Sequence, residues 1–154
     1  MISIQKLFIT ALYFLAATSA LAQGNFTLLS GNNEVFDSNT GLIWKRCSEG
    51  QAWDVSLNNC EGIAGTYLYG VALQNAKTEK TTAKKWRVPS VKELLSITDT
   101  TQSNPTIDSV FFPNTTKGRY WTSTTYGGGN VVVVDFISAG IGGGSGRLSV
   151  RLVR

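Results

Sequence analysis

One stretch of the sequence decides the fold: Trp86-Arg87-Val88-Pro89-Ser90-Val91-Lys92-Glu93-Leu94. Its second half is a capping box, because the Ser90 hydroxyl can accept from the Glu93 amide while the glutamate side chain reaches back to the Ser90 amide. Pro89 rigidifies the entry. The pattern predicts a helix from Val91 to about Ile97, with a large aromatic residue, Trp86, just before it in a compact core.

A second tryptophan segment, Tyr120-Trp121-Thr122-Ser123-Thr124, begins the C-terminal third and predicts a strand over residues 120–125. Four consecutive valines in the next strand, 131–137, indicate burial on both faces and hence a central position in the sheet. Glycine-rich segments at 127–130 and 140–146 are interpreted as mobile hairpin loops, and a phosphate-binding role is disfavoured because the expected lysine or serine spacing is missing. Residues 148–153 are expected to form a closing strand.

The N-terminal half supplies a hairpin and a first helix. Residues 34–37 and 42–46 read as two strands around the turn Asp37-Ser38-Asn39-Thr40-Gly41. Apolar residues at helical spacing predict a helix over 67–77. A hairpin, two helices and then several antiparallel strands define an α+β domain with its helices segregated in sequence.

The chain begins with the features of a secretory signal peptide. Lys6 is followed by an apolar run over 7–17 and by the small residues of Ala20-Leu21-Ala22, so cleavage is expected before Gln23. The apolar run is shorter than the roughly 20 residues that span a bilayer. We therefore expect residues 1–22 to be a signal peptide, 23–33 a flexible mature N-terminus, and 34–154 one domain of a periplasmic or extracellular protein.

The sequence contains two cysteines, Cys47 and Cys60. In an exported chain they are expected to pair with each other, and closing a loop of about 14 residues stabilises a fold by about 3 kcal/mol. The alternative, a redox-active or metal-binding pair, is disfavoured because there is no Cys-x-x-Cys spacing and no histidine in the chain.

Several separated motifs resemble the bacterial Lcl C-terminal domain family. They are Phe36 to Cys47, Gly50-Gln51-Ala52-Trp53, Cys60, Trp86-Arg87-Val88-Pro89, Lys92-Glu93-Leu94, Ile107-Asp108, Phe112-Pro113, Tyr120-Trp121-Thr122-Ser123 and Val150 to Arg154. The resemblance implies a C-type-lectin-like or formylglycine-generating-enzyme-like fold, with two helices packed on a small twisted antiparallel sheet. In the family's namesake this domain lies at the tip of a collagen-like adhesin associated with glycosaminoglycan binding, whereas this chain has no collagen repeat.

The residue inventory disfavours catalysis. The chain has no histidine to act as a general base, its cysteines are expected to be paired, and its ten carboxylates are scattered, although a Ser-Lys arrangement stays open. The resemblance to C-type lectins would imply a calcium site only if the Glu-Pro-Asn or Gln-Pro-Asp and Trp-Asn-Asp tripeptides were present, and the sequence has none of them. We expect no enzyme activity, no metal and no cofactor.

Basic residues are concentrated in one short region, where an anionic ligand could bind, although a solvated loop without a ligand is the alternative. They are Lys77, Lys80, Lys84, Lys85, Arg87 and Lys92. Arg87 belongs to the Trp-Arg-x-Pro motif, and we expect it to hold a neighbouring loop or a carboxylate, with Asp108 and Asp135 as candidate partners.

The tryptophans divide into two groups. We assign Trp44, Trp86 and Trp121 to the core and expect Trp53, inside the disulfide loop, to be exposed, so that with Tyr126 it could stack on a sugar ring. The residues predicted to bind a ligand are Lys77, Lys80, Lys84, Lys85, Trp53 and Tyr126. The residues assigned a structural role, besides the two cysteines, are Trp86, Arg87, Pro89, Glu93 and Trp121.

These features favour a small exported binding domain whose partner is an anionic polysaccharide or another surface molecule. The alternative is a structural or assembly module in a cell-envelope or pilus-type complex, and an enzyme is the third and weakest hypothesis. The net charge of +4 falls to +3 when Lys6 leaves with the signal peptide, and this mild value gives no support for a nucleic-acid partner.

Overall fold

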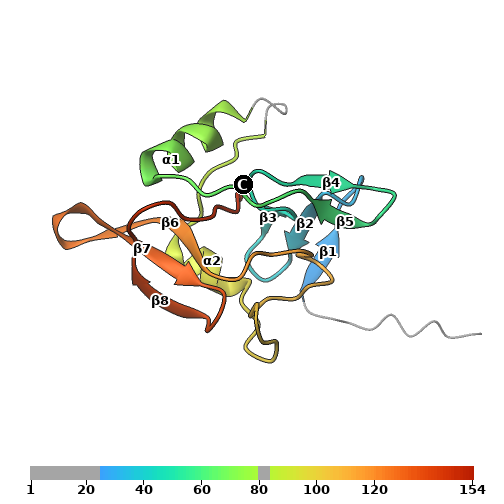
Figure 1. Cartoon of the computed structure of the whole chain (residues 1–154). Coiled ribbons are helices and arrows are strands. Elements are labelled where there is room, and N and C mark those ends of the chain that lie inside the picture. The colour runs from blue at the N-terminus through green and yellow to red at the C-terminus, as the bar shows by residue number, and fades with distance from the viewer. Residues whose placement is uncertain (1–24, 80–83) are drawn as a thin grey trace, which may run out of the picture.

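The computed structural model describes residues 25–79 and 84–154. Within these residues the chain forms three small antiparallel sheets and two α-helices, so the α+β class is confirmed (Figure 1). The predicted signal peptide, residues 1–22, and the predicted ligand residue Lys80 lie outside the described residues. Among the described helices, none has the length and apolar character needed to cross a membrane.

The sheets follow one another along the chain, and each is a simple antiparallel meander. The first has the order β1-β2-β3, the second β4-β5 and the third β6-β7-β8. The strands are β1 Phe26–Leu28, β2 Glu34–Asp37, β3 Leu42–Lys45, β4 Ala52–Asp54, β5 Asn59–Glu61, β6 Arg119–Tyr126, β7 Asn130–Asp135 and β8 Gly140–Gly143. The helices α1 Tyr69–Thr78 and α2 Val91–Ser96 lie between the second and third sheets in sequence.

The predicted hairpin over residues 34–46 is confirmed as β2 and β3. Its register pairs Glu34 with Lys45 and Val35 with Trp44. Gly41 has φ +72° in the connecting turn, a conformation that glycine adopts without strain. The segment 23–33, expected to be flexible, contains β1, which pairs with β2 because Phe26 packs on the rings of Phe111 and Phe112.

Helix α2 begins as the sequence predicts. The Ser90 hydroxyl accepts from the Glu93 amide at 3.3 Å, and the Glu93 carboxylate accepts from the Ser90 amide at 2.7 Å. Leu94 is fully buried, and the helix packs against β6 and β7. Helix α1 has no side-chain cap at its start and buries Ala72 and Ala76 instead.

The arrangement of sheets differs from the expected single sheet carrying both helices. The glycine-rich segment 140–146, interpreted as a loop, contributes strand β8, whose residues pair with the valines of β7. Gly144 follows it, and a Cβ there would lie 2.2 Å from the Trp121 ring, so the absence of a side chain lets this segment approach the core. Strand β7 lies between β6 and β8, which confirms its central position.

The expected closing strand over 148–153 is an extended segment that makes isolated bridges. Leu148 bridges Tyr67, Ser149 bridges Tyr120, and Val153 bridges both Trp44 and Arg87. The segment runs between sheets, so its backbone bonds are divided among several elements instead of being given to one neighbouring strand. The C-terminus consequently lies in the middle of the fold, between α1 and β3 (Figure 1).

Two clusters of buried residues make the core, and both are built from residues 26–44 and 67–153. Trp44 belongs to the first, whereas Trp86 and Trp121 belong to the second, which confirms that all three indoles are interior. The Trp121 indole N–H donates to the Tyr67 carbonyl at 2.7 Å, which satisfies its polar edge.

Arg151 is completely buried. Its guanidinium donates to the carbonyl oxygens of Lys45 (3.0 Å) and Arg46 and to the hydroxyls of Ser48 (3.3 Å) and Thr115 (2.7 Å). Burial lowers its pKa to about 10, so the side chain stays charged at neutral pH. It therefore fixes the chain that leaves β3 toward Cys47.

Candidate functional site

A cavity of about 240 Å³ lies where the end of α1, the β2–β3 hairpin and the disulfide segment meet. We call it the indole pocket, because tryptophans from two distant segments line it. Its lining residues are Asn33, Glu34, Lys45, Cys47, Gln51, Trp53, Glu79, Lys84 and Trp86. This volume is below the roughly 300–1,000 Å³ of ordinary ligand pockets, so the cavity could admit one small ring at most.

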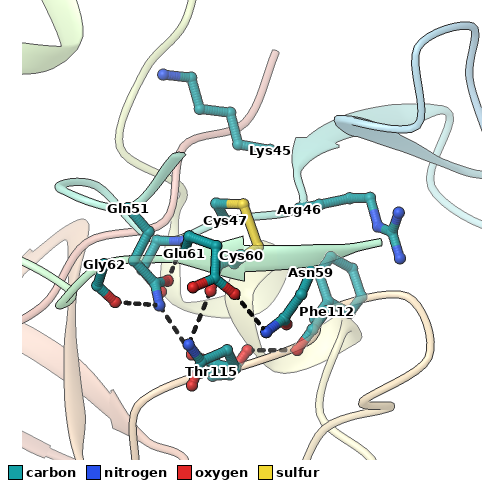
Figure 2. The surroundings of a disulfide bond; sticks show 12 residues. Lys45, Arg46, Cys47, Gln51, Asn59, Cys60, Glu61, Gly62, Phe112 and Thr115 are labelled. Carbon is teal, nitrogen blue, oxygen red and sulfur yellow. Dashed lines mark hydrogen bonds between the residues drawn. A yellow bond between two sulfur atoms is a disulfide. The ribbon is translucent and has the colours of Figure 1, made fainter. Parts of the chain in front are cut away.

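The disulfide confirms the predicted cysteine pairing. Cys47 follows β3 and Cys60 lies in β5, and the two sulfur atoms are bonded. The segment between them forms the β4–β5 hairpin, in which Trp53 stands opposite Cys60. Figure 2 shows this hairpin beside the bond, with the side chains of Lys45 and Arg46 leaving the chain in different directions.

The pocket's charged side chains are paired with one another. Lys45 contacts Glu49 at 3.0 Å and also Glu79, which joins the end of β3 to the end of α1. The Glu34 carboxylate forms ion pairs with Lys84 and with Arg154, the second at 2.7 Å. Burial alone would raise the pKa of Glu34, but the hydrogen bonds from these two cations outweigh it, and the pKa is lowered.

The two pocket indoles are held by cations. The Arg46 guanidinium lies 3.9 Å from the Trp53 ring centroid, and its donors are taken up by the carbonyls of Asn32, Val110 and Phe111. Lys45 and Arg154 lie within 5.6 and 5.3 Å of the Trp86 ring centroid. These cation–π contacts fix the orientation of both rings at the pocket wall.

The structure brings some of the predicted ligand residues together and separates others. Trp53 and Lys84 both line the pocket, although Lys84 is paired with Glu34. Lys77 and Lys85 are exposed, and each lies one or two residues from a pocket residue in sequence. Tyr126 is half exposed at the end of β6, and the β6–β7 connection extends away from β4 (Figure 1), so Trp53 and Tyr126 do not form one platform.

Several pocket residues were not predicted: Asn33, Glu34, Lys45, Gln51 and Glu79. One signal could have found a pair of them. The predicted hairpin places Glu34 directly opposite Lys45, and opposite charges on facing positions of two strands mark a polar patch. Glu79 gives no comparable signal, since it is brought to the pocket by the packing of α1.

A second, polar cavity of about 360 Å³ includes Asp37, Asp99 and Asp108 among its lining residues. Each carboxylate accepts from a backbone amide within three residues, as expected for turns. Within residues 25–79 and 84–154 no three His, Cys, Asp or Glu side chains gather as metal ligands.

Arg87 holds a carboxylate, as expected, but its partner is neither of the two candidates, Asp108 and Asp135. Asp108 caps a local turn, and Asp135 lies 3.7 Å from Arg119. Arg87 instead makes two hydrogen bonds with the Glu93 carboxylate, at 2.7 and 2.8 Å. The reason is local: the capping box already holds Glu93 at the start of α2, beside the strand-like segment that carries Arg87.

This pair predicts an acid-sensitive contribution to stability. The hydrogen bonds from Arg87 are the main cause that lowers the pKa of Glu93 from 4.5 to about 2. A depressed carboxylate pKa stabilises the fold above the unfolded value and loses that effect as the pH falls from 4.5 to 2. Because Arg87 is partly exposed, we expect a loss of about 1–2 kcal/mol.

The measurement is urea unfolding at several pH values for the wild type and Glu93→Gln, which keeps an oxygen for the Ser90 amide. The wild type should be more stable above pH 5, and the difference should vanish near pH 2. Arg87→Met should keep a smaller pH dependence than the wild type, because Glu93 still titrates and still accepts from Ser90. Equal stabilities of wild type and Glu93→Gln at neutral pH would contradict the prediction.

The fold and pocket define a small disulfide-containing α+β domain with a cavity at its stapled hairpin. A family model described as the Lcl C-terminal domain matches residues 33–154. The match spans more than half of the chain, and the protein belongs to this family. No curated protein and no solved structure matches the chain, and the C-type-lectin-like fold stays a prediction.

Proposed function

We propose that the protein is an exported, non-catalytic binding domain that recognises an acidic polysaccharide at the indole pocket. The observation that carries the proposal is the composition of this pocket. It combines the Trp53 and Trp86 indoles with amide and charged side chains in a cavity of about 240 Å³. Aromatic surface beside convergent hydrogen-bonding groups is the combination that holds a polyhydroxylated ring.

The ion pairs of the pocket favour a ligand whose uncharged rings and acidic groups bind at different places. Glu34 is paired with Lys84 and Arg154, and Lys45 is paired with Glu49 and Glu79. A ring entering the pocket with a net charge would have to break one of these pairs, which costs desolvation free energy. We therefore assign the pocket to an uncharged ring of the polysaccharide, held by its hydroxyl groups.

The acidic groups of the same polymer are assigned to exposed lysines next to the pocket. Lys77 lies in the last turn of α1, and Lys85 lies between Lys84 and Trp86. In the part of the chain that the structure describes, neither forms an ion pair. Exposed ammonium groups without a counter-ion are available to sulfate or carboxylate groups, and their contribution weakens with salt.

The test measures retention of the protein on an immobilised, sparsely sulfated dextran, most of whose rings carry no charge, at low and high salt. Lys77→Ala with Lys85→Ala should weaken binding about tenfold at low ionic strength, because two exposed charges contribute about 0.5–1 kcal/mol each. Salt at roughly 0.5 M should remove the difference between this variant and the wild type.

A matched control removes two exposed lysines from other parts of the fold, Lys92 on α2 and Lys117 in the connection before β6. Lys92→Ala with Lys117→Ala changes the net charge equally and should weaken binding less than twofold if the contacts are local. Equal losses of affinity in both variants would show that binding depends on the net charge of the protein and not on the lysines beside the pocket. If the wild type is not retained at low salt, the polysaccharide proposal is wrong and a protein-assembly role is favoured.

A further inference from the structure

We infer that the disulfide completes the indole pocket, so that reducing it removes the pocket wall while the core stays folded. The part of the inference that concerns ligand binding rests on the proposed function. The part that concerns the position of the pocket wall does not. It makes the ligand-binding form dependent on an oxidising environment. The oxidised protein would then have a complete pocket that binds the ligand, and the reduced protein would lack the wall that carries Trp53.

The part of the pocket wall that the disulfide segment supplies belongs to neither of the two core clusters, although both cysteines are buried. Both core clusters are built from residues 26–44 and 67–153, whereas Cys47, Gln51 and Trp53 come from the segment between these ranges. Strands β4 and β5 form a two-stranded sheet of their own, and a two-stranded hairpin is marginally stable in water. Val55 and Leu57 at its turn are 75% and 62% exposed, so apolar burial contributes little to holding it.

The S–S bond is the covalent part of the attachment. Ser48 is also held by buried hydrogen bonds to Tyr120 and Arg151, whereas the side-chain hydrogen bonds that tie the later part of the segment to Asn114 are part-buried or exposed. Trp53 stands opposite Cys60 in the hairpin register, so the position of Cys60 sets that of the indole. The Asn114 side chain donates to the Cys60 carbonyl at 2.7 Å, and Gln51 donates to the Asn114 carbonyl at 3.1 Å. Stacking on Arg46 adds a contact that requires the hairpin to be in place.

The redox step is an exchange with a dithiol reductant. Two thiolates of the reductant attack in turn, the Cys47–Cys60 bond breaks, both cysteines take up a proton as thiols, and the reductant leaves as a disulfide. Cys60 is fully buried and Cys47 is 8% exposed, so attack requires the hairpin to open locally first. Local opening is accessible here because the turn of the β4–β5 hairpin is exposed and the two strands join no larger sheet.

The experiment follows four indole N–H resonances by NMR and the binding of the same sparsely sulfated dextran in the same samples, with and without dithiothreitol. Trp53→Phe identifies the Trp53 resonance. Cys47→Ala with Cys60→Ala provides a second route to the same state. On reduction, the Trp53 resonance should move to the position of a solvated indole, the Trp44 and Trp121 resonances should stay, and affinity should fall about tenfold.

Each outcome decides between the ideas. An unchanged Trp53 resonance with unchanged affinity would overturn the inference and leave the proposed function intact. Loss of all four native resonances on reduction would also overturn it, because the disulfide would then hold the whole fold. Absence of binding by the oxidised protein would refute the proposed function, while the Trp53 resonance would still decide whether the disulfide builds the pocket.

Discussion

Replacing Arg151 with alanine is expected to lower the free energy of unfolding by about 3–5 kcal/mol, because the change creates a large cavity and leaves buried acceptors unsatisfied. The carbonyls of Lys45 and Arg46 and the hydroxyl of Thr115 would lose their donor in a place that water does not reach. Urea unfolding at pH 7, followed by tryptophan fluorescence, measures the difference.

One further variant separates the charge of Arg151 from its hydrogen bonds, and another provides a surface control. Arg151→Lys keeps a cation but loses the planar guanidinium, so it should recover less than half of the stability that Arg151→Ala loses. Arg119→Ala is the surface control, since Arg119 is about half exposed and lies 3.7 Å from Asp135, and it should change stability by less than about 0.5 kcal/mol. A loss below about 1 kcal/mol for Arg151→Ala would contradict the prediction.

The second large effect is expected at Gly50, where alanine should cost about 2–4 kcal/mol. Gly50 has φ +91°, and a Cβ there would lie 2.6 Å from the Gly65 backbone nitrogen. That nitrogen donates to the Glu49 carbonyl at 2.8 Å, so it cannot move without breaking a backbone hydrogen bond. Thermal and urea unfolding would both report the loss.

Gly62 offers a matched control twelve residues along the same segment. Its φ is +87°, but a Cβ there would meet only the Gly50 carbonyl oxygen at 3.7 Å, an ordinary contact. Gly62→Ala should therefore cost only the conformational strain of about 1–2 kcal/mol. The difference between the two variants isolates the close backbone approach, and equal losses would show that strain alone accounts for both.

Local signals in the sequence were sufficient for the elements that carry their own contacts. The capping box at Ser90 and Glu93, the hairpin over 34–46 and the Cys47–Cys60 bond are all found as expected. Each depends on residues that are close in the chain or, for the cysteines, have no alternative partner. The three buried tryptophans also followed, because large aromatics at element ends favour the core.

The missed elements are those whose strands have weak intrinsic propensity. Strand β8 has the sequence Gly140-Ile141-Gly142-Gly143, and glycine is depleted in strands, so only pairing with β7 makes it one. Strands β4 and β5 have three residues each, too few for an alternating pattern to be recognised. In both cases tertiary packing overrides local preference.

The site was predicted in part for a related reason. Trp53 and Lys84 were identified from residue type, and both line the pocket. The other charged residues of the pocket come from distant parts of the sequence. Lys84 pairs with Glu34, 50 positions away, and Lys45 pairs with Glu79, 34 positions away. No pattern within one segment encodes these two ion pairs. Apart from Glu34 facing Lys45 in the predicted hairpin, the polar groups of the pocket could be identified only from the packed chain.

The position of residues 148–153 has a consequence for biosynthesis. These residues supply backbone partners to Tyr67, Tyr120, Trp44 and Arg87, which are spread over most of the domain. Contacts between such distant positions form late, since the intervening chain must first be brought together at an entropic cost. A nascent chain in which this stretch is still inside the ribosome lacks the backbone partners that join its sheets, so the domain should fold only after residues 148–153 have emerged.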